Sequence, residues 1–138
     1  MGRTEIIEHT ADVGLGIWGK NLEELFRLGA EGMFSLIADL SQVEAKEREK
    51  VELEAGSVGE LFHDWLDELL YLFDTRHILF RNYEFEKLDE KHLRAIATGE
   101  KVNFDKHDLH KEIKAVTRHN YRVEKKPEGW EAEVLFDI

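Results

Sequence analysis

Two stretches of apolar residues at helical spacing constrain the fold of this chain more than any other feature of its sequence. Asn21 is suited to cap the first helix, with Glu24 three residues later, and Ser57 and Glu60 form a capping box for the second. Behind these caps the apolar residues recur on one helical face: Leu22, Leu25, Phe26, Ala30, Met33, Phe34 and Ile37, then Leu61, Phe62, Trp65, Leu66, Leu69, Leu70 and Phe73. The sequence therefore predicts two amphipathic helices.

Most of the remaining chain alternates apolar and polar residues, as half-buried strands do. The predicted strands cover residues 4–8, 13–18, 50–54, 79–86, 92–98, 113–117, 121–123 and 130–137. Residues 99–110 are polar and predict a loop, and Pro127-Glu128-Gly129 predicts a turn. We expect an α+β fold in which the two helices pack on a mixed, largely antiparallel sheet, either as one sheet or split into two layers.

Length and composition predict a single domain over residues 1–138. The chain is 42% hydrophobic, contains one proline and has no Pro/Gly/Ser-rich linker, so we expect one packed core without a domain boundary. No apolar run is long enough to span a membrane, and no signal-peptide core follows the first residues. Cysteine is absent, which excludes disulfides and thiolate metal sites. A cytoplasmic location fits these features best.

The formal net charge of −11 limits the partners that the chain is suited to bind. Bare nucleic acid is a poor direct partner, because phosphate binding requires clustered Lys and Arg. A basic protein surface or a cation is a more natural partner. The alternative, that the acidity only keeps the protein in solution, stays open.

Acidic groups near the two ends of the chain are the main candidates for a functional site. Asp12 precedes a predicted strand, and Asp137 is followed directly by the carboxylate of Ile138. If the two ends lie in adjacent strands, the three acids meet, and clustered carboxylates need a cation to stay ionised. Oxygen ligands of this kind suit Ca²⁺ or Mg²⁺. The alternative is that Asp12 caps a turn and the terminus frays.

Lys114 is a further candidate, because it stands opposite Ile113 and Ala115 on a predicted strand. Its ammonium group could pair with Asp12 or Asp137, reach a phosphate, or remain solvated.

Other catalytic chemistry finds little support in the sequence. There is no cysteine, no Gly-x-Ser-x-Gly elbow and no complete phosphate-binding loop. His107 and His110 are spaced for one helical face, but the matching second pair that a zinc site needs is missing. His9 and His119 adjoin candidate site segments, where they either bond to backbone or orient the site residues.

Several motifs together identify a family resemblance over essentially the whole chain. They are residues 9–14 (HTADVG), 22–26 (LEELF), 65–72 (WLDELLYL), 99–100 (GE), 112–117 (EIKAVT), Trp130 and the terminal 136–138 (FDI). Taken in order, they resemble the archease family. Arg118 is a departure, because the family usually has Tyr at that position.

The resemblance implies a function that the residues alone do not. Archeases are accessory proteins of the tRNA-splicing RNA ligase of RtcB type, and they promote ligase guanylylation and multiple turnover. By resemblance this chain is a protein cofactor in tRNA processing and not an enzyme. Asp12, Asp137 and Ile138 would bind a divalent metal ion, calcium first with magnesium or manganese possible, and Lys114 would be a further functional residue. The alternatives are a chaperone, a modulator of a tRNA methyltransferase, or a free-standing metal-dependent phosphohydrolase.

Overall fold

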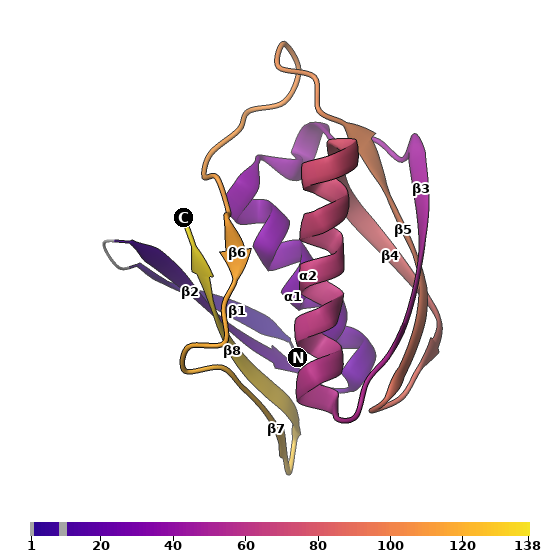
Figure 1. Cartoon of the computed structure of the whole chain (residues 1–138), viewed down its shortest axis with the longest axis vertical. Coiled ribbons are helices and arrows are strands. Elements are labelled where there is room, and N and C mark those ends of the chain that lie inside the picture. Colours follow the sequence, from indigo (N-terminus) through magenta and orange to yellow (C-terminus); the bar gives the residue numbers. More distant parts are fainter. Residues whose placement is uncertain (1, 9–10) are drawn as a thin grey trace.

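The two helices lie between two antiparallel β-sheets in the computed structural model of the chain, which describes residues 2–8 and 11–138 (Figure 1). Helix α1 spans Leu22–Ile37 and contacts strands of both sheets, and α2 spans Val58–Arg76 and does the same. The predicted α+β class and both predicted helices are therefore confirmed. The helices form a middle layer, so α1 buries residues on two sides.

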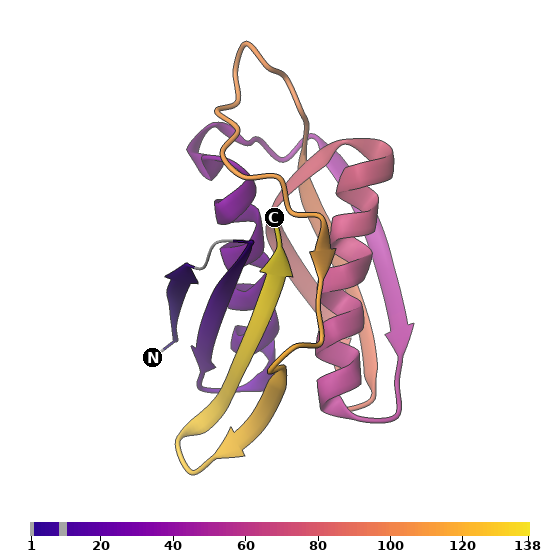
Figure 2. The ribbon, with the colours of Figure 1, turned by 60° about the vertical axis from the view of Figure 1, so that its left-hand side comes forward.

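The larger sheet contains both ends of the described chain. Its order is β1-β2-β8-β6, and β7 also pairs with β8. The strands span Arg3–Glu8 (β1), Asp12–Gly19 (β2), Ala115–Val116 (β6), Arg122–Lys126 (β7) and Gly129–Asp137 (β8). Every pairing described in this sheet is antiparallel. Figure 2 shows β8 running between β2 and β6 toward the C-terminus.

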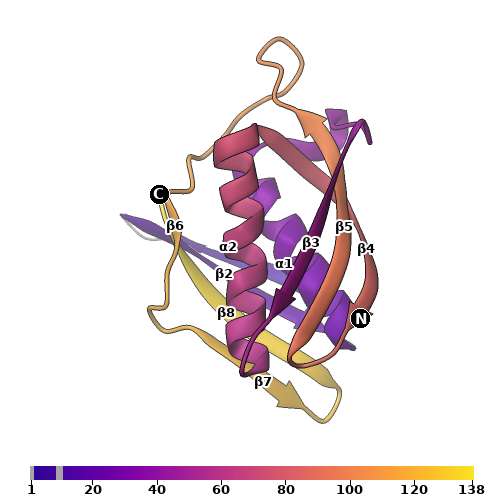
Figure 3. The ribbon, with the colours of Figure 1, turned by 45° about the vertical axis from the view of Figure 1, so that its right-hand side comes forward.

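The smaller sheet covers the other side of the helices (Figure 3). Its order is β3-β5-β4, with strands Glu47–Glu54 (β3), Ile78–Leu88 (β4) and His92–Lys101 (β5), again all antiparallel. A short 3-10 helix, η1 at Leu40–Gln42, leads from α1 toward β3. The sheet is thus split into two layers.

Both predicted helix caps are present. The Asn21 side chain accepts a 2.9 Å hydrogen bond from the Glu24 amide, and the Ser57 hydroxyl oxygen accepts one of 3.3 Å from the Glu60 amide. Each satisfies an amide that the first helical turn leaves free. His77 follows the last residue of α2 as its C-cap, and its φ of 58° is the left-handed conformation that commonly terminates helices. No helix in residues 2–8 and 11–138 is long and apolar enough to cross a membrane.

Two glycines let α1 approach its neighbours closely. A Cβ on Gly32 would lie 2.7 Å from the Leu15 Cδ2 atom of β2, and one on Gly29 would lie 2.5 Å from the Phe62 Cζ atom of α2. The core of α1, α2 and both sheets contains six fully buried aromatic side chains among others: Phe26, Phe34, Phe62, Trp65, Phe80 and Phe136.

The structure corrects several predicted boundaries. Strand β3 begins at Glu47 and not at residue 50, and β7 extends to Lys126 and not only to residue 123. Strand β5 continues through Gly99 to Lys101, because Gly99 lies against the Leu79 backbone, where a side chain would not fit. The strand predicted over residues 113–117 is reduced to Ala115–Val116. The segment before it bonds instead to the end of α1, since the His110 and Lys111 amides donate to the Ile37 and Leu36 carbonyls at 2.7 and 3.1 Å.

Gly99→Ala tests the close backbone packing of β4 and β5. A Cβ at this position would lie 1.8 Å from the Leu79 carbonyl oxygen, so the strands must separate. We expect a loss of about 3 kcal/mol in the free energy of unfolding, at the upper end of overpacking effects. Urea unfolding measures it. Gly59→Ala is the control, because a Cβ in this first turn of α2 would meet the Tyr121 ring at 3.9 Å, an ordinary contact, so the change is expected to be neutral or stabilising. Equal stability of the two variants would contradict the packing account.

Candidate functional site

The register of β2 against β8 brings Asp12 and Asp137 directly opposite each other. The next pair, Val13 and Phe136, is fully buried against the helices. Because side chains alternate between the faces of a sheet, Asp12 and Asp137 both point to the outer face, away from the helices. Cross-strand partners have Cβ atoms about 4.5–5.5 Å apart. The adjacency that the metal hypothesis requires is therefore present.

Ile138 and Lys114 lie on either side of this pair. The Ile138 amide donates to the Ala11 carbonyl at 3.4 Å, which keeps the end of β8 beside the start of β2. The Lys114 amide donates to the Asp137 carbonyl at 2.7 Å, just before Ala115 pairs with Asp137. All four predicted site residues thus lie at one end of the larger sheet, where Figure 2 shows the C-terminus between β2 and β6.

The residues present at this end fit a divalent cation. Asp12 is half-buried, and its Oδ1 atom is buried without any hydrogen-bond partner. Such an atom is costly unless a donor or a cation compensates it. Among the described residues no group of three His, Cys, Asp or Glu side chains is arranged for a metal. Asp12 and Asp137 supply two carboxylates here, the Ile138 carboxylate is the predicted third ligand, and the cation itself stays a prediction.

Two glycines flatten the outer face beside the acids. A Cβ on Gly14 would lie 3.1 Å from the Leu135 Cδ2 atom, and a Cβ on Gly16 would lie 3.0 Å from the Trp18 ring. Leu135 and Trp18 thus pack close to the backbone at these two positions.

Trp18 is the centre of a polar cluster further along the same face. The Arg3 guanidinium stacks 3.8 Å from the centroid of its ring, and the indole N–H donates to Glu131. Arg122 donates to the other Glu131 oxygen at 2.9 Å. The hydrogen bond from Arg122, and then that from Trp18, lowers the pKa of Glu131. These contacts hold the outer face in one arrangement.

The histidines singled out in the sequence lie apart from the acids where they are described. His107 is buried against Glu100, whereas His110 is exposed beside Asp108, so the two have different partners. His119 is exposed, and its amide donates to the Thr117 hydroxyl oxygen at 3.2 Å. His9, and Thr10 of the same motif, lie outside the described residues.

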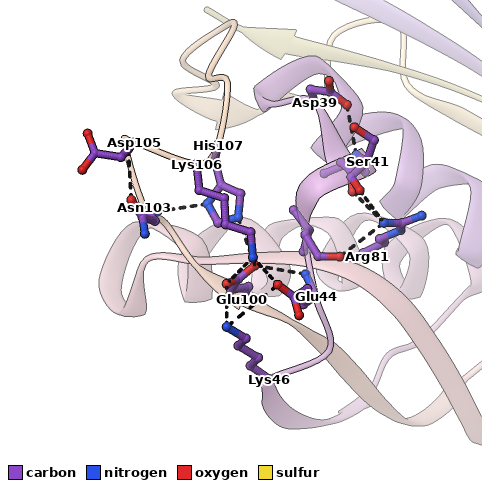
Figure 4. A network of polar contacts seen from close by, with 12 residues as sticks. Asp39, Ser41, Glu44, Lys46, Arg81, Glu100, Asn103, Asp105, Lys106 and His107 are labelled. Carbon is purple, nitrogen blue, oxygen red and sulfur yellow. Dashed lines mark hydrogen bonds and ion pairs between the residues drawn. The ribbon is translucent and has the colours of Figure 1, made fainter.

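A second polar cluster, which sequence analysis did not identify, surrounds Glu100 at the end of β5 (Figure 4). Lys106 donates to both Glu100 oxygens at 2.9 Å, and His107 Nε2 donates to one of them at 3.1 Å. The Glu44 amide also donates to Glu100, at 3.1 Å, and Lys46 lies 3.3 Å away. The hydrogen bond from Lys106 is the largest cause that lowers the Glu100 pKa to about 2. The only signal in the sequence is an acid followed by Lys and His within a polar stretch.

Comparison with known proteins gives one consistent result. The model of the Archease protein family (MTH1598/TM1083) matches residues 5–138. Proteins named "Protein archease" from Methanopyrus kandleri and Pyrococcus abyssi are each 39% identical, covering 97% and 100% of this chain and 98% and 100% of their own length.

Solved structures agree with the sequence relatives. The solution structure of Methanobacterium thermoautotrophicum protein 1598 has a TM-score of 0.82 at 36% identity and covers 98% of both chains. The crystal structure of a Thermotoga maritima archease, described as a possible chaperone, has a TM-score of 0.67 at 20% identity, over 96% of this chain and 94% of its own. The second likeness supports the fold alone.

Asp12→Asn and Asp137→Asn test whether the paired carboxylates hold a cation. Without divalent ions each variant should be slightly more stable than the unmodified chain, by about 0.5 kcal/mol, because like charges face each other across the strands. Saturating Ca²⁺ should raise the melting temperature of the unmodified chain. At a calcium concentration one hundred times the dissociation constant, the free energy of unfolding should increase by about 2.7 kcal/mol. Both variants should lose that increase, as measured by thermal unfolding with and without calcium.

Asp67→Asn, on the exposed side of α2, is the matched control and should keep the calcium response. A calcium response that survives in Asp12→Asn would refute the proposed ligand set.

Glu100→Gln should alter the acid stability of the chain. The folded pKa of about 2 is below the ordinary value of 4.5, so Glu100 stabilises the fold above pH 4.5, and that contribution is lost as the pH falls toward 2. The free energy of unfolding of the variant should be lower at neutral pH and fall less steeply between pH 4.5 and 2. Urea unfolding across that range measures it. Glu90→Gln, in the exposed turn between β4 and β5, is the control, and identical slopes for both variants would contradict the assignment.

Proposed function

The chain belongs to the archease family, and from this membership we propose that it is an accessory protein that activates an RtcB-type tRNA-splicing RNA ligase. In this proposal it promotes guanylylation of the ligase and lets the ligase turn over repeatedly. It performs no ligation itself. The active site belongs to the ligase, and this chain contributes its acidic end.

The observation that supports this proposal best is the pairing of Asp12 with Asp137 and the buried, unpartnered Oδ1 atom of Asp12. Asp12, Asp137 and the Ile138 carboxylate are proposed to hold a divalent cation, calcium first and magnesium or manganese otherwise. When bound, such a cation supplies positive charge beside phosphate groups as a bond to nucleotide breaks. Asp12 lies in β2 and Asp137 in β8, so the pairing of these strands holds the backbone that carries the two carboxylates.

Lys114 is proposed to act beside these acids. Its backbone is held by Asp137, while its side chain is exposed. An exposed ammonium group at this position can bind a phosphate oxygen or a carboxylate of the partner. The net charge of −11 favours a basic protein partner over RNA itself, because a surface of this sign repels phosphates.

A chaperone, or a modulator of a tRNA methyltransferase, is the second candidate. The Thermotoga maritima archease is described as a possible chaperone, which favours the first of these. A general chaperone needs a broad apolar patch for its clients. The large apolar side chains that are exposed in the described part of the chain lie on three separate segments, β1, α2 and the loop after β5: Ile6, Ile7, Tyr71, Phe104 and Leu109. Because they lie on separate segments, these side chains do not make the broad patch that a general chaperone needs.

Reconstitution with the ligase tests the proposal. The purified chain, mixed with the cognate ligase, GTP and manganese, should increase guanylylated ligase and change RNA joining from a single turnover to many. Asp12→Asn and Asp137→Asn should reduce this stimulation at least 100-fold. Lys114→Ala should reduce it about 10-fold while keeping the calcium response in thermal unfolding.

Asp67→Asn should stimulate the ligase as the unmodified chain does. The proposal fails if the unmodified chain leaves guanylylation and turnover unchanged. Suppression of the aggregation of unrelated proteins would support the chaperone instead.

A further inference from the structure

An exposed aromatic side chain projects from the connection between β5 and β6. Phe104 is 81% exposed, the largest exposed fraction among the large apolar side chains described. The connection, residues 102–114, forms the crest beyond the ends of both helices in Figure 1. A phenylalanine in water gains about 1.5–3 kcal/mol when it becomes buried, so this ring favours any contact that covers it.

The turn that carries Phe104, residues 103–106, is closed by four hydrogen bonds. The Lys106 and His107 amides donate to the Asn103 carbonyl at 3.0 and 2.7 Å. The Asp105 amide donates to Asn103 Oδ1 at 2.9 Å, and the Asn103 amide donates to His107 Nδ1 at 3.0 Å. The ring is therefore held on a single backbone conformation.

The Glu100 cluster fastens this turn to the body of the protein (Figure 4). Since His107 Nδ1 accepts from Asn103, the ring proton is on Nε2, which donates to Glu100. The His107 side chain is fully buried. Lys106 reaches Glu100 and Glu44, which joins the turn to the segment before β3. Glu100 and His107 are buried at the centre of this network, Lys106 is partly exposed, and the turn that they hold contributes no side chain of its own to the apolar core.

We infer that Phe104 is an anchor that inserts into an apolar socket with a basic rim on the partner protein; this inference rests on the proposed function and names a second contact with the same ligase. Aromatic side chains dominate the energy of protein interfaces. A turn whose backbone is already ordered loses little backbone entropy on binding. Beside the ring lies an open hollow of about 550 Å³, lined in part by Lys46, Val102 and Asp105. The hollow leaves space for the partner's side chains to surround the ring.

The charges around Phe104 favour a basic protein over RNA as its occupant. The hollow is lined by Glu47, Glu100 and Asp105 together with Lys46 and Lys101. Lys46 pairs with Glu100 at 3.3 Å, whereas Glu47 and Asp105 make no ion pair with the described residues, and Asp108 is exposed in the same connection. Carboxylates repel the phosphates that accompany a stacked base, and they attract Lys and Arg on a protein.

The connection also links the anchor to the acidic end of the sheet. After the turn it bonds to the end of α1, where the Lys111 side chain pairs with Glu8 of β1 at 3.5 Å, and it then reaches Lys114 beside Asp137. A partner that contacts both Phe104 and the acids would be held at two points on one side of the molecule. Two contacts fix orientation as well as affinity.

Binding of the ligase to Phe104→Ala tests the inference. Biolayer interferometry with the immobilised full-length ligase should show at least 10-fold weaker binding for Phe104→Ala and a smaller loss for Phe104→Leu, which keeps an apolar side chain. Tyr71→Ala is the matched control, because Tyr71 is an aromatic residue 59% exposed on α2, and its binding should stay within 2-fold of the unmodified chain. Thermal unfolding should be the same for all variants, since the replaced rings are solvent-exposed.

The outcomes separate this inference from the proposed function. If the unmodified chain binds and activates the ligase and Phe104→Ala binds within 2-fold of it, the anchor is wrong and the activator proposal stands. If the unmodified chain does not bind the ligase, both fall. If Phe104→Ala instead weakens the binding of a fluorescent single-stranded RNA and leaves ligase binding intact, the ring contacts nucleic acid and the protein socket is wrong.

Discussion

The antiparallel pairing of β2 with β8 is the interaction on which the rest of this structure depends. It joins the start of the chain to its end over eight successive residue pairs, from Asp12↔Asp137 to Gly19↔Trp130. Val13, Leu15 and Ile17 from one strand meet Ala132, Val134 and Phe136 from the other on the face that covers α1. A slip of one residue would turn this apolar set toward solvent, so burial itself fixes the register. The same register then brings two aspartates together on the opposite face.

Placing the helices between the sheets makes this arrangement rigid. Helix α1 contacts β2 and β8 on one side and β4 on the other, which requires small residues where its neighbours come closest. Gly32 faces β2 and Gly29 faces α2, each at a distance where a Cβ would collide. Because both sheets cover the helices, contact with other molecules is left to the outer faces of the sheets, the exposed side of α2, the strand ends and the connections. The acidic end of the larger sheet and the crest after β5 are both of this kind.

Local patterns in the sequence predicted most of the fold. Helical periodicity with caps at Asn21 and Ser57 marked both helices, and alternation marked most of the strands. What the sequence could not determine depends on long-range packing. The alternation in residues 113–117 suits a strand, but the preceding backbone bonds to the end of α1, so only Ala115–Val116 pair with β8. The sequence predicted a loop at Gly99, yet Gly99 lies inside β5. Only glycine fits there, because the Leu79 backbone occupies the space that a Cβ would need.

The sequence likewise predicted one part of the polar sites and missed another. Asp12 and Asp137 were predicted to be neighbours from their positions near the two chain ends, and the register brings them together. The cluster of Glu100, Lys106 and His107 was not predicted, since no spacing rule links an acid at a strand end to two basic residues of the following loop. Pairs of this kind become visible only when the path of the loop is known.

We propose that Asp12, Asp137 and the Ile138 carboxylate converge on a single cation. A crystal structure of the chain grown with Mn²⁺, with anomalous scattering data, would locate such an ion. We expect one strong anomalous peak at the end of β2 and β8, bound to oxygens of all three groups at about 2.1–2.6 Å. A peak held by other residues, or no peak while the two aspartate side chains point apart, would contradict it.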